Sequence, residues 1–307
     1  MRGVVFTGDR QLELMTFPDP TPGPGEVVLE MKASGMCGSD LHQYRRPKNQ
    51  ERNATGLPPN PNPTIAGQQL CQEVPVKVYG SNSHGGHAQY ICVPANTLVP
   101  LPDELSFSAG AAISCGSGTA WGALRRMNVS GRDTIAIFGQ GPVGLAATQF
   151  AKAQGARVIA LDINDARLAR AREFGADETV NPGSNDPVAA IKDLTHGRYA
   201  DLTLDTSSNS EARLNAIKST KVWGTMCFVG EGGNVTIDVS PHILRRQLTL
   251  IGSWTFSNVI QAECARFCVE RKVDVDALFT HQWKLDQAEE AYVLFDKQSD
   301  GKGVFLI

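Results

Sequence analysis

The sequence lacks a dense run of basic residues, and it lacks an apolar run long enough to span a bilayer. The net charge is −3, so nucleic acid is not an expected partner. The stretch from Met1 to Arg10 has no apolar signal core, which predicts a cytoplasmic protein without membrane association. With 307 residues, of which 41% are hydrophobic and 20% charged, the chain is expected to be globular and long enough for two domains.

Stable disulfides are not expected either. The chain has 7 cysteines, an odd number, and no export signal. Cys264 and Cys268 are one helical turn apart, which is typical of the buried face of a helix.

The pattern of residues changes near Ser106. Before it, short β-rich stretches at 3–6, 27–32 and 90–93 are interrupted by prolines, which predicts a small barrel or sandwich; residues 44–63 read as a long polar loop. After it, strands and helices alternate, which predicts an α/β domain with a parallel sheet covered on both faces. The expected strands are 134–138, 157–162, 202–205, 226–229 and 249–252, and the expected helices are 109–124, 142–154, 165–174, 211–218, 258–271 and 285–296.

A glycine-rich turn lies between the first of these strands and the helix that follows it. Its residues are Gly139, Gln140, Gly141, Pro142, Val143 and Gly144. In this context the first glycine permits a tight turn, the second lets a pyrophosphate approach the backbone, and the third allows close packing of the helix on the strand. Asp162 ends the next strand, where a carboxylate accepts hydrogen bonds from the adenine ribose, so NAD is favoured over NADP. Arg167, five residues on, weakens that preference.

A second motif runs from Cys37 through Gly38, Ser39, Asp40 and Leu41 to His42. Together with the glycine-rich turn, it resembles the zinc-dependent medium-chain alcohol and polyol dehydrogenases, such as sorbitol and threonine dehydrogenases. The resemblance implies a truncated GroES-like β-barrel domain at 1–115, a Rossmann domain at 116–255 and a segment at 256–307 that returns to the first domain. It also implies NAD as cofactor, an alcohol or polyol as substrate, and a homo-oligomer.

The resemblance assigns roles to individual residues. It places Cys37 and Cys115 on a catalytic zinc, Ser39 and His42 in a proton relay, and Asp40 behind a metal-bound histidine. It extends the cofactor site to Thr119, Val229 and Gly230, with Ser253 and Trp254 as the opposite wall.

The resemblance fails after Gly67, where the family continues into a zinc-binding His-Glu pair and this chain continues with Gln68. An internal deletion is therefore expected, with Cys71 as the remnant of a structural-zinc lobe. Two cysteines are fewer than the three protein ligands of a catalytic zinc, so zinc is expected from the family but doubtful in this chain. His84 and His87 are the nearest replacements, although a histidine pair without a metal is the favoured interpretation. Two alternatives stay open: a zinc-free reductase of the quinone or enoyl type, and an inactive relative that binds NAD(H).

Overall fold

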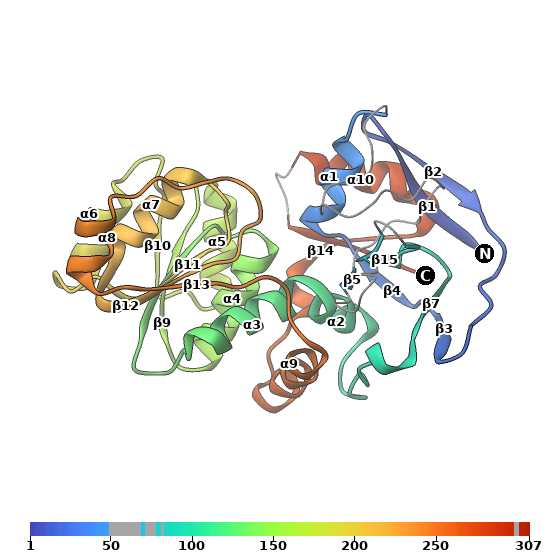
Figure 1. Ribbon diagram of the computed structural model, residues 1–307, viewed down its shortest axis with the longest axis horizontal. Coiled ribbons are helices and arrows are strands. Elements are labelled where there is room, and N and C mark those ends of the chain that lie inside the picture. The colour runs from blue at the N-terminus through green and yellow to red at the C-terminus, as the bar shows by residue number, and fades with distance from the viewer. Residues whose placement is uncertain (49–68, 71–77, 81–82, 298–300) are drawn as a thin grey trace. The chain divides into compact units, whose positions relative to one another are not determined.

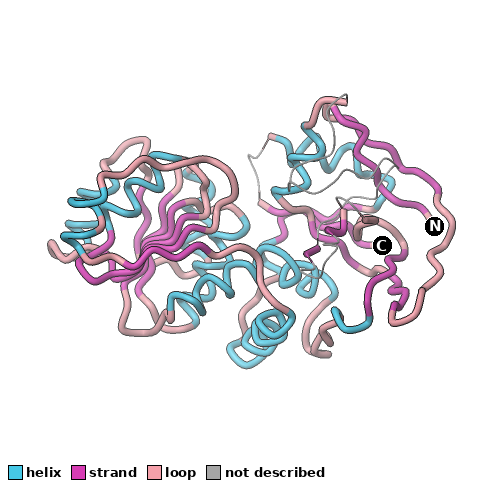
Figure 2. Tube along the Cα trace, viewed as in Figure 1, coloured by secondary structure: helices cyan, strands magenta, loops and turns pink. Residues whose placement is uncertain are grey.

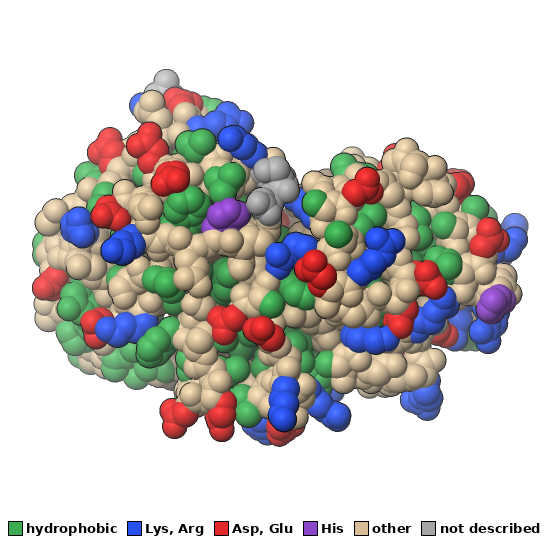
Figure 3. Space-filling model, turned by 180° about the vertical axis from the view of Figure 1, so that it is seen from behind, with side chains coloured by type: hydrophobic (Ala, Val, Ile, Leu, Met, Phe, Trp, Pro, Cys, Tyr) green, Lys and Arg blue, Asp and Glu red, His purple; other side chains and the backbone are tan. Residues whose placement is uncertain are grey.

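The computed structural model describes residues 1–48, 69–70, 78–80, 83–297 and 301–307 (Figure 1). Gly67, Gln68 and Cys71 lie outside these residues, as does most of the proline-rich stretch. Among the described residues, no helix is both long and apolar enough to cross a membrane. On the face drawn in Figure 3, acidic and basic side chains are interspersed rather than gathered by sign, in keeping with the small net charge.

The chain forms two compact units. The first comprises Met1–Cys115, Ser257–Val269 and Asp274–Ile307, and the second comprises Gly116–Phe256 and Glu270–Val273.

The second unit contains a parallel sheet, whose strands are drawn in magenta in Figure 2. It has six strands in the order β10-β9-β8-β11-β12-β13. The strand of this sheet that comes first in sequence, β8, lies between β9 and β11, so the direction of winding reverses there, as in dinucleotide-binding sheets. The bounds are β8 Thr134–Phe138, β9 Arg157–Leu161, β10 Glu178–Val180, β11 Ala200–Asp205, β12 Thr220–Phe228 and β13 Thr249–Gly252.

Three helices of this unit, α5, α6 and α7, begin where short polar side chains satisfy free backbone N–H groups. Asn164, Asp186 and Asn209 each accept hydrogen bonds from two amides of the following turn. The helices are α3 Gly118–Met127, α4 Pro142–Ala153, α5 Asp165–Glu173, α6 Pro187–Leu194, α7 Ser210–Ser219 and α8 Val239–His242, with a 3₁₀ turn, η3, at Leu244–Arg246. Buried aliphatic residues of the strands and of α6 and α7 form one core.

The first unit consists of small sheets around an aromatic core. Phe6, Tyr44, Tyr292 and Phe305 are buried together, and the rings of Phe6 and Tyr292 lie 4.8 Å apart edge to face. The strands are β1 Arg2–Gly8, β2 Gln11–Thr16, β3 Glu26–Glu30, β4 Ala33–Gly35, β5 Gln69–Leu70, β6 Val78–Tyr79, β7 Tyr90–Pro94, β14 Phe279–Trp283 and β15 Lys302–Leu306. The helices are α1 Gly38–Arg45, α2 Phe107–Ala112, α9 Asn258–Arg271 and α10 Ala288–Asp296, with 3₁₀ turns η1 Ala95–Thr97, η4 Asp276–Leu278 and η5 Leu285–Gln287.

The α/β fold class, with its parallel Rossmann sheet, is confirmed, but some elements differ from the prediction. The helix expected at 109–124 is interrupted by a π-helical stretch, η2, at Ile113–Ser117. The hydroxyl of Ser114 donates to the carbonyl of Gly110 at 2.8 Å, a bond that competes with the regular helical pattern. The prediction missed α1, α6 and β10, and Tyr44 belongs to α1 rather than to a loop.

Candidate functional site

The glycine-rich turn joins β8 to α4, and each of its glycines meets a different requirement. Gly139 has φ +97°, a conformation that favours glycine. A Cβ atom on Gly144 would lie 1.9 Å from the carbonyl oxygen of Gly139. A Cβ atom on Gly141 would meet nothing within 4 Å. Backbone conformation therefore favours glycine at 139 and packing demands it at 144, whereas Gly141 leaves open space at the start of α4, where a phosphate would be bound.

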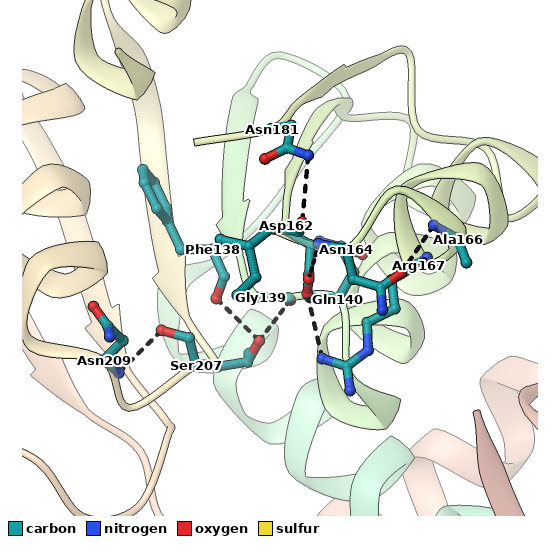
Figure 4. Close-up of polar contacts among 12 residues, drawn as sticks. Phe138, Gly139, Gln140, Asp162, Asn164, Ala166, Arg167, Asn181, Ser207 and Asn209 are labelled. Atoms are coloured by element: carbon teal, nitrogen blue, oxygen red, sulfur yellow. Dashed lines mark hydrogen bonds and ion pairs between the residues drawn. The ribbon is translucent and has the colours of Figure 1, made fainter. Parts of the chain in front are cut away.

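Asp162 follows β9 directly and lies against this turn (Figure 4). Its Oδ2 accepts the backbone N–H of Gln140 at 2.6 Å, and its Oδ1 accepts the N–H of Asn164 at 2.9 Å. Arg167 Nη1 lies 3.7 Å from Oδ2. The side chain is 5% exposed, so the carboxylate has a fixed position and its charge is partly balanced.

The side chains that support the turn could not be recognised from the sequence. Thr206 Oγ1, just after β11, donates to the carbonyl of Gly139 at 2.8 Å. The amide of Gln140 is buried: its Nε2 donates to Ile137 O at 3.1 Å, and its Oε1 accepts from Thr148 Oγ1 at 3.0 Å. The turn is therefore held from the neighbouring strand and from α4.

Val229 and Gly230 follow β12, and both of their amides donate to the carbonyl of Asp205. Arg213 reinforces this junction, since its Nε bonds the Asp205 carboxylate at 2.9 Å and its Nη2 donates to Gly230 O at 2.5 Å. A Cβ on Gly230 would lie 2.4 Å from the backbone nitrogen of Ser208, so the close approach of these two backbone segments requires glycine at 230. Several hydrogen bonds within the second unit therefore hold this segment.

The remaining predicted cofactor residues also lie in the second unit. Thr119 is half-buried in the first turn of α3. Ser253 is buried and its N–H donates to Phe228 O at 2.9 Å, whereas Trp254 is 53% exposed.

In the first unit, Cys37 lies between β4 and α1, and its backbone N–H donates to Asp40 Oδ2 at 2.8 Å. Cys115, in η2, comes close to it: the two sulfur atoms are 3.0 Å apart. Ser39 is half-buried beside Cys37, and His42 is exposed on α1. The structure thus brings together Cys37, Cys115, Ser39 and Asp40.

The two thiols differ in acidity. The pKa of Cys37 is lowered to about 6, chiefly by the hydrogen bond from Cys115 and also by the Lys302 ammonium, against the opposing effect of burial. The same hydrogen bond and burial raise the pKa of Cys115 well above its usual range. Lys302 is buried and donates to Met36 O at 2.9 Å, a role that the sequence did not indicate.

The sequence offers His87 as a possible replacement ligand, with a histidine pair without a metal as the favoured interpretation, and the structure shows which side chains its ring contacts. The ring is fully buried, with Nδ1 2.7 Å from Ser34 Oγ and Nε2 2.8 Å from Tyr292 Oη. Its Nε2 lies 3.7 Å from Asp40 Oδ2. Asp40 therefore has a histidine neighbour within the first unit. His84 instead packs edge-on against Phe17 at 5.2 Å.

Comparison with known proteins identifies the family. The model of the family described as "Zinc-binding dehydrogenase" matches residues 142–270. The "Uncharacterized zinc-type alcohol dehydrogenase-like protein YphC" of Escherichia coli is 33% identical, over 99% of this chain and 98% of its own length. The chain belongs to the zinc-type alcohol dehydrogenase-like family. The alignment with this relative spans 349 residues, more than the 307 of this chain, as an internal deletion requires.

Other members of this family have named activities. L-threonine 3-dehydrogenase of Pyrococcus horikoshii is 28% identical over 96% of this chain and 95% of its own length. Sorbitol dehydrogenase of Bacillus subtilis is 27% identical over 95% and 92%. A solved structure of an NAD-dependent alcohol dehydrogenase, 27% identical, covers 100% of both chains with a TM-score of 0.85.

The described residues fit a zinc ion only in part. Thiolates are ligands that zinc prefers, and Cys37 and Cys115 are close enough to share one ion. A catalytic zinc needs three protein ligands, however, and no group of three His, Cys, Asp or Glu able to hold a metal occurs in the part of the chain that the structure describes. Among the described residues, Cys37 and Cys115 are therefore an incomplete ligand set for a catalytic zinc.

Proposed function

We propose that this protein is an NAD-dependent oxidoreductase that transfers hydride between a secondary alcohol or polyol and nicotinamide. The observation that carries the proposal is the glycine-rich turn, with open space at Gly141 and the Asp162 carboxylate fixed beside it. Both features suit a dinucleotide: the start of α4 can take the pyrophosphate, and a carboxylate can accept ribose hydroxyls. The named relatives, which include a sorbitol and a threonine dehydrogenase, support the substrate class.

The cofactor residues would act in three groups. Gly139, Gly141, Pro142, Val143 and Gly144 would present the start of α4 to the pyrophosphate. Asp162 would accept the ribose hydroxyls, with Arg167 beside it. Thr119, Val229 and Gly230 would contact the nicotinamide end.

The substrate residues would lie in the first unit. Oxidation of an alcohol releases one hydride, which nicotinamide accepts, and one proton. Ser39, beside Cys37, and the exposed His42 on the same helix would carry that proton to water, with Asp40 holding Cys37 in position. The domain boundaries at 115 and 255, the cytoplasmic location and the homo-oligomer stay predictions.

A zinc-free reductase and an inactive NAD(H)-binding relative are the competing proposals. The retained Cys37, Ser39 and His42 favour the dehydrogenase over a zinc-free reductase, which needs none of them. The ligand set, which is incomplete among the residues that the structure describes, supports the inactive relative.

One set of measurements separates the three. The purified protein is titrated with NADH by fluorescence, analysed for zinc, and assayed with NAD and a panel of secondary alcohols and polyols. NADH binding with alcohol oxidation supports the dehydrogenase. NADPH- or NADH-dependent reduction of a quinone or enone, without alcohol oxidation, supports the reductase. NADH binding without any turnover supports the inactive relative, and no binding of either cofactor contradicts all three.

A further inference from the structure

Cys37 and Cys115 approach each other from two separate elements. Cys37 precedes the first turn of α1, and Cys115 lies in η2. Their sulfur atoms are 3.0 Å apart. A disulfide requires about 2.05 Å, whereas two thiolates on one tetrahedral zinc at about 2.3 Å each would be roughly 3.8 Å apart. The observed separation is shorter than shared zinc ligation implies, and about 1 Å of movement closes a disulfide.

The backbone on both sides holds this approach. The N–H of Met36 donates to Gly303 O at 3.0 Å, and the N–H of Cys37 donates to Asp40. On the side of Cys115, the hydroxyl of the preceding residue, Ser114, donates a hydrogen bond to Gly110 O and accepts one from Gln261 Nε2 at 3.0 Å. Hydrogen bonds next to each cysteine in the sequence therefore hold the backbone segments that bring the two sulfur atoms together.

Both cysteines are half-buried, so a small oxidant can reach them. Cys227, Cys264 and Cys268 are buried, and buried thiols are usually inert. Cys92 is also half-buried, but its Sγ points to Glu26 Oε2 at 3.6 Å, an acidic partner that does not favour oxidation.

We propose that Cys37 and Cys115 form a reversible disulfide, which makes this pair a peroxide-responsive modification site. A structural disulfide is not implied, because disulfides in a reducing compartment are usually transient and redox-sensing. Only the effect on dehydrogenase activity rests on the function proposed above; formation of the bond does not.

The reaction balances with hydrogen peroxide as oxidant. The Cys37 thiolate attacks one peroxide oxygen, the O–O bond breaks, and a sulfenic acid and hydroxide form. The Cys115 thiol then attacks the sulfenic sulfur and expels its oxygen as water, which closes the S–S bond. Two thiols lose two electrons in total, peroxide is reduced to water, and a dithiol reductant reverses the step by exchange.

The test treats the reduced full-length protein with graded hydrogen peroxide, alkylates the remaining thiols, and identifies the peptides by mass. We expect a Cys37–Cys115 cross-linked peptide that dithiothreitol removes. Cys37→Ser and Cys115→Ser should each abolish it. Cys92→Ser, a matched half-buried control, and Cys71→Ser should leave it in place. A cross-link that joins Cys71 to either cysteine, or sulfinic acid on Cys37 without a cross-link, would overturn the proposal.

One further readout, alcohol oxidation, separates this proposal from the proposed function. Cross-link formation is measured by mass, so it can succeed in a protein that oxidises no alcohol, and it can fail in an active dehydrogenase. If the reduced protein oxidises alcohols, oxidation of the pair should abolish that activity and dithiothreitol should restore it. Full activity of the cross-linked protein would show that the pair does not lie in the active site, which contradicts the proposed function and not the disulfide.

Discussion

A Cβ atom placed on Gly144 would lie 1.9 Å from the carbonyl oxygen of Gly139, so the start of α4 and the end of β8 are in direct backbone contact. No such neighbour surrounds Gly141, three residues earlier. The two glycines of one motif thus serve different purposes: Gly144 serves the protein's own packing, and Gly141 leaves room for a ligand.

This difference predicts opposite outcomes for two alanine variants. Gly144→Ala should destabilise the fold by about 1–3 kcal/mol, because backbone atoms must move to admit the methyl group. Gly141→Ala should keep the thermal stability of the parent but weaken NADH binding by at least about tenfold, or ~1.4 kcal/mol. Thermal unfolding and NADH titration measure the two effects. Gly131→Ala, at the opposite end of β8, serves as control, and parent-like NADH binding by Gly141→Ala would argue against a pyrophosphate at this turn.

Asp162→Ala should weaken NADH binding and relax discrimination against NADPH, because the carboxylate would accept ribose hydroxyls and repel a ribose phosphate. The alanine also removes the carboxylate that accepts a hydrogen bond from the backbone N–H of Gln140. Asp162→Asn keeps an acceptor without the charge, so it isolates the electrostatic part. Titration with both cofactors checks this, with the exposed Asp165→Ala as control. Equal affinity of the parent for NADH and NADPH would refute the role of Asp162.

The protein should bind less than one zinc per subunit, and none of the structural type. The reason is the number of ligands, since the described residues bring together only Cys37 and Cys115. Elemental analysis after dialysis measures the content. Stoichiometric zinc that resists chelators would reveal a third ligand outside the described residues.

Because a missing Lewis acid costs several kcal/mol of transition-state stabilisation, alcohol oxidation should be slow, and restoring a His-Glu pair after Gly67 should raise it.

Asp296 should make the first unit sensitive to acid. Burial tends to raise the pKa of Asp296, but Arg45 and Arg10 together lower it below its usual value. A carboxyl whose pKa is lower in the folded state stabilises the protein above its unfolded pKa of about 3.9, and this contribution is lost as pH falls through the folded pKa. Asp296→Asn should therefore cost about 1 kcal/mol at neutral pH and nothing at pH values below both pKa values.

Urea unfolding of the parent and Asp296→Asn from neutral to acidic pH tests this expectation. Glu290→Gln, an exposed carboxylate on the same helix, is the matched control and should behave as the parent. A stability difference between the parent and Asp296→Asn that does not change with pH would show that the arginine pairs contribute no charge-dependent stability.

The sequence alone determined the Rossmann half of this protein. Regular alternation of apolar strands with helices, and a glycine motif between the first strand and its helix, depend on local periodicity and on backbone conformation, both of which can be read from neighbouring residues. The sequence also indicated Cys37 and Asp162 by position. It missed α6 and the three-residue β10 because short elements carry little periodic signal.

Only the tertiary structure decided which distant side chains meet. Thr206 supports Gly139 from another strand, His87 and Tyr292 come to Asp40 from segments 205 residues apart, and Cys115 reaches Cys37 across 78 residues. The π-helical interruption at η2 carries Cys115 and is accompanied by a Ser114 side-chain hydrogen bond, neither of which a hydrophobic period predicts. Spacing along the chain does not encode such contacts, because they follow from how whole elements pack once the hydrophobic core has formed.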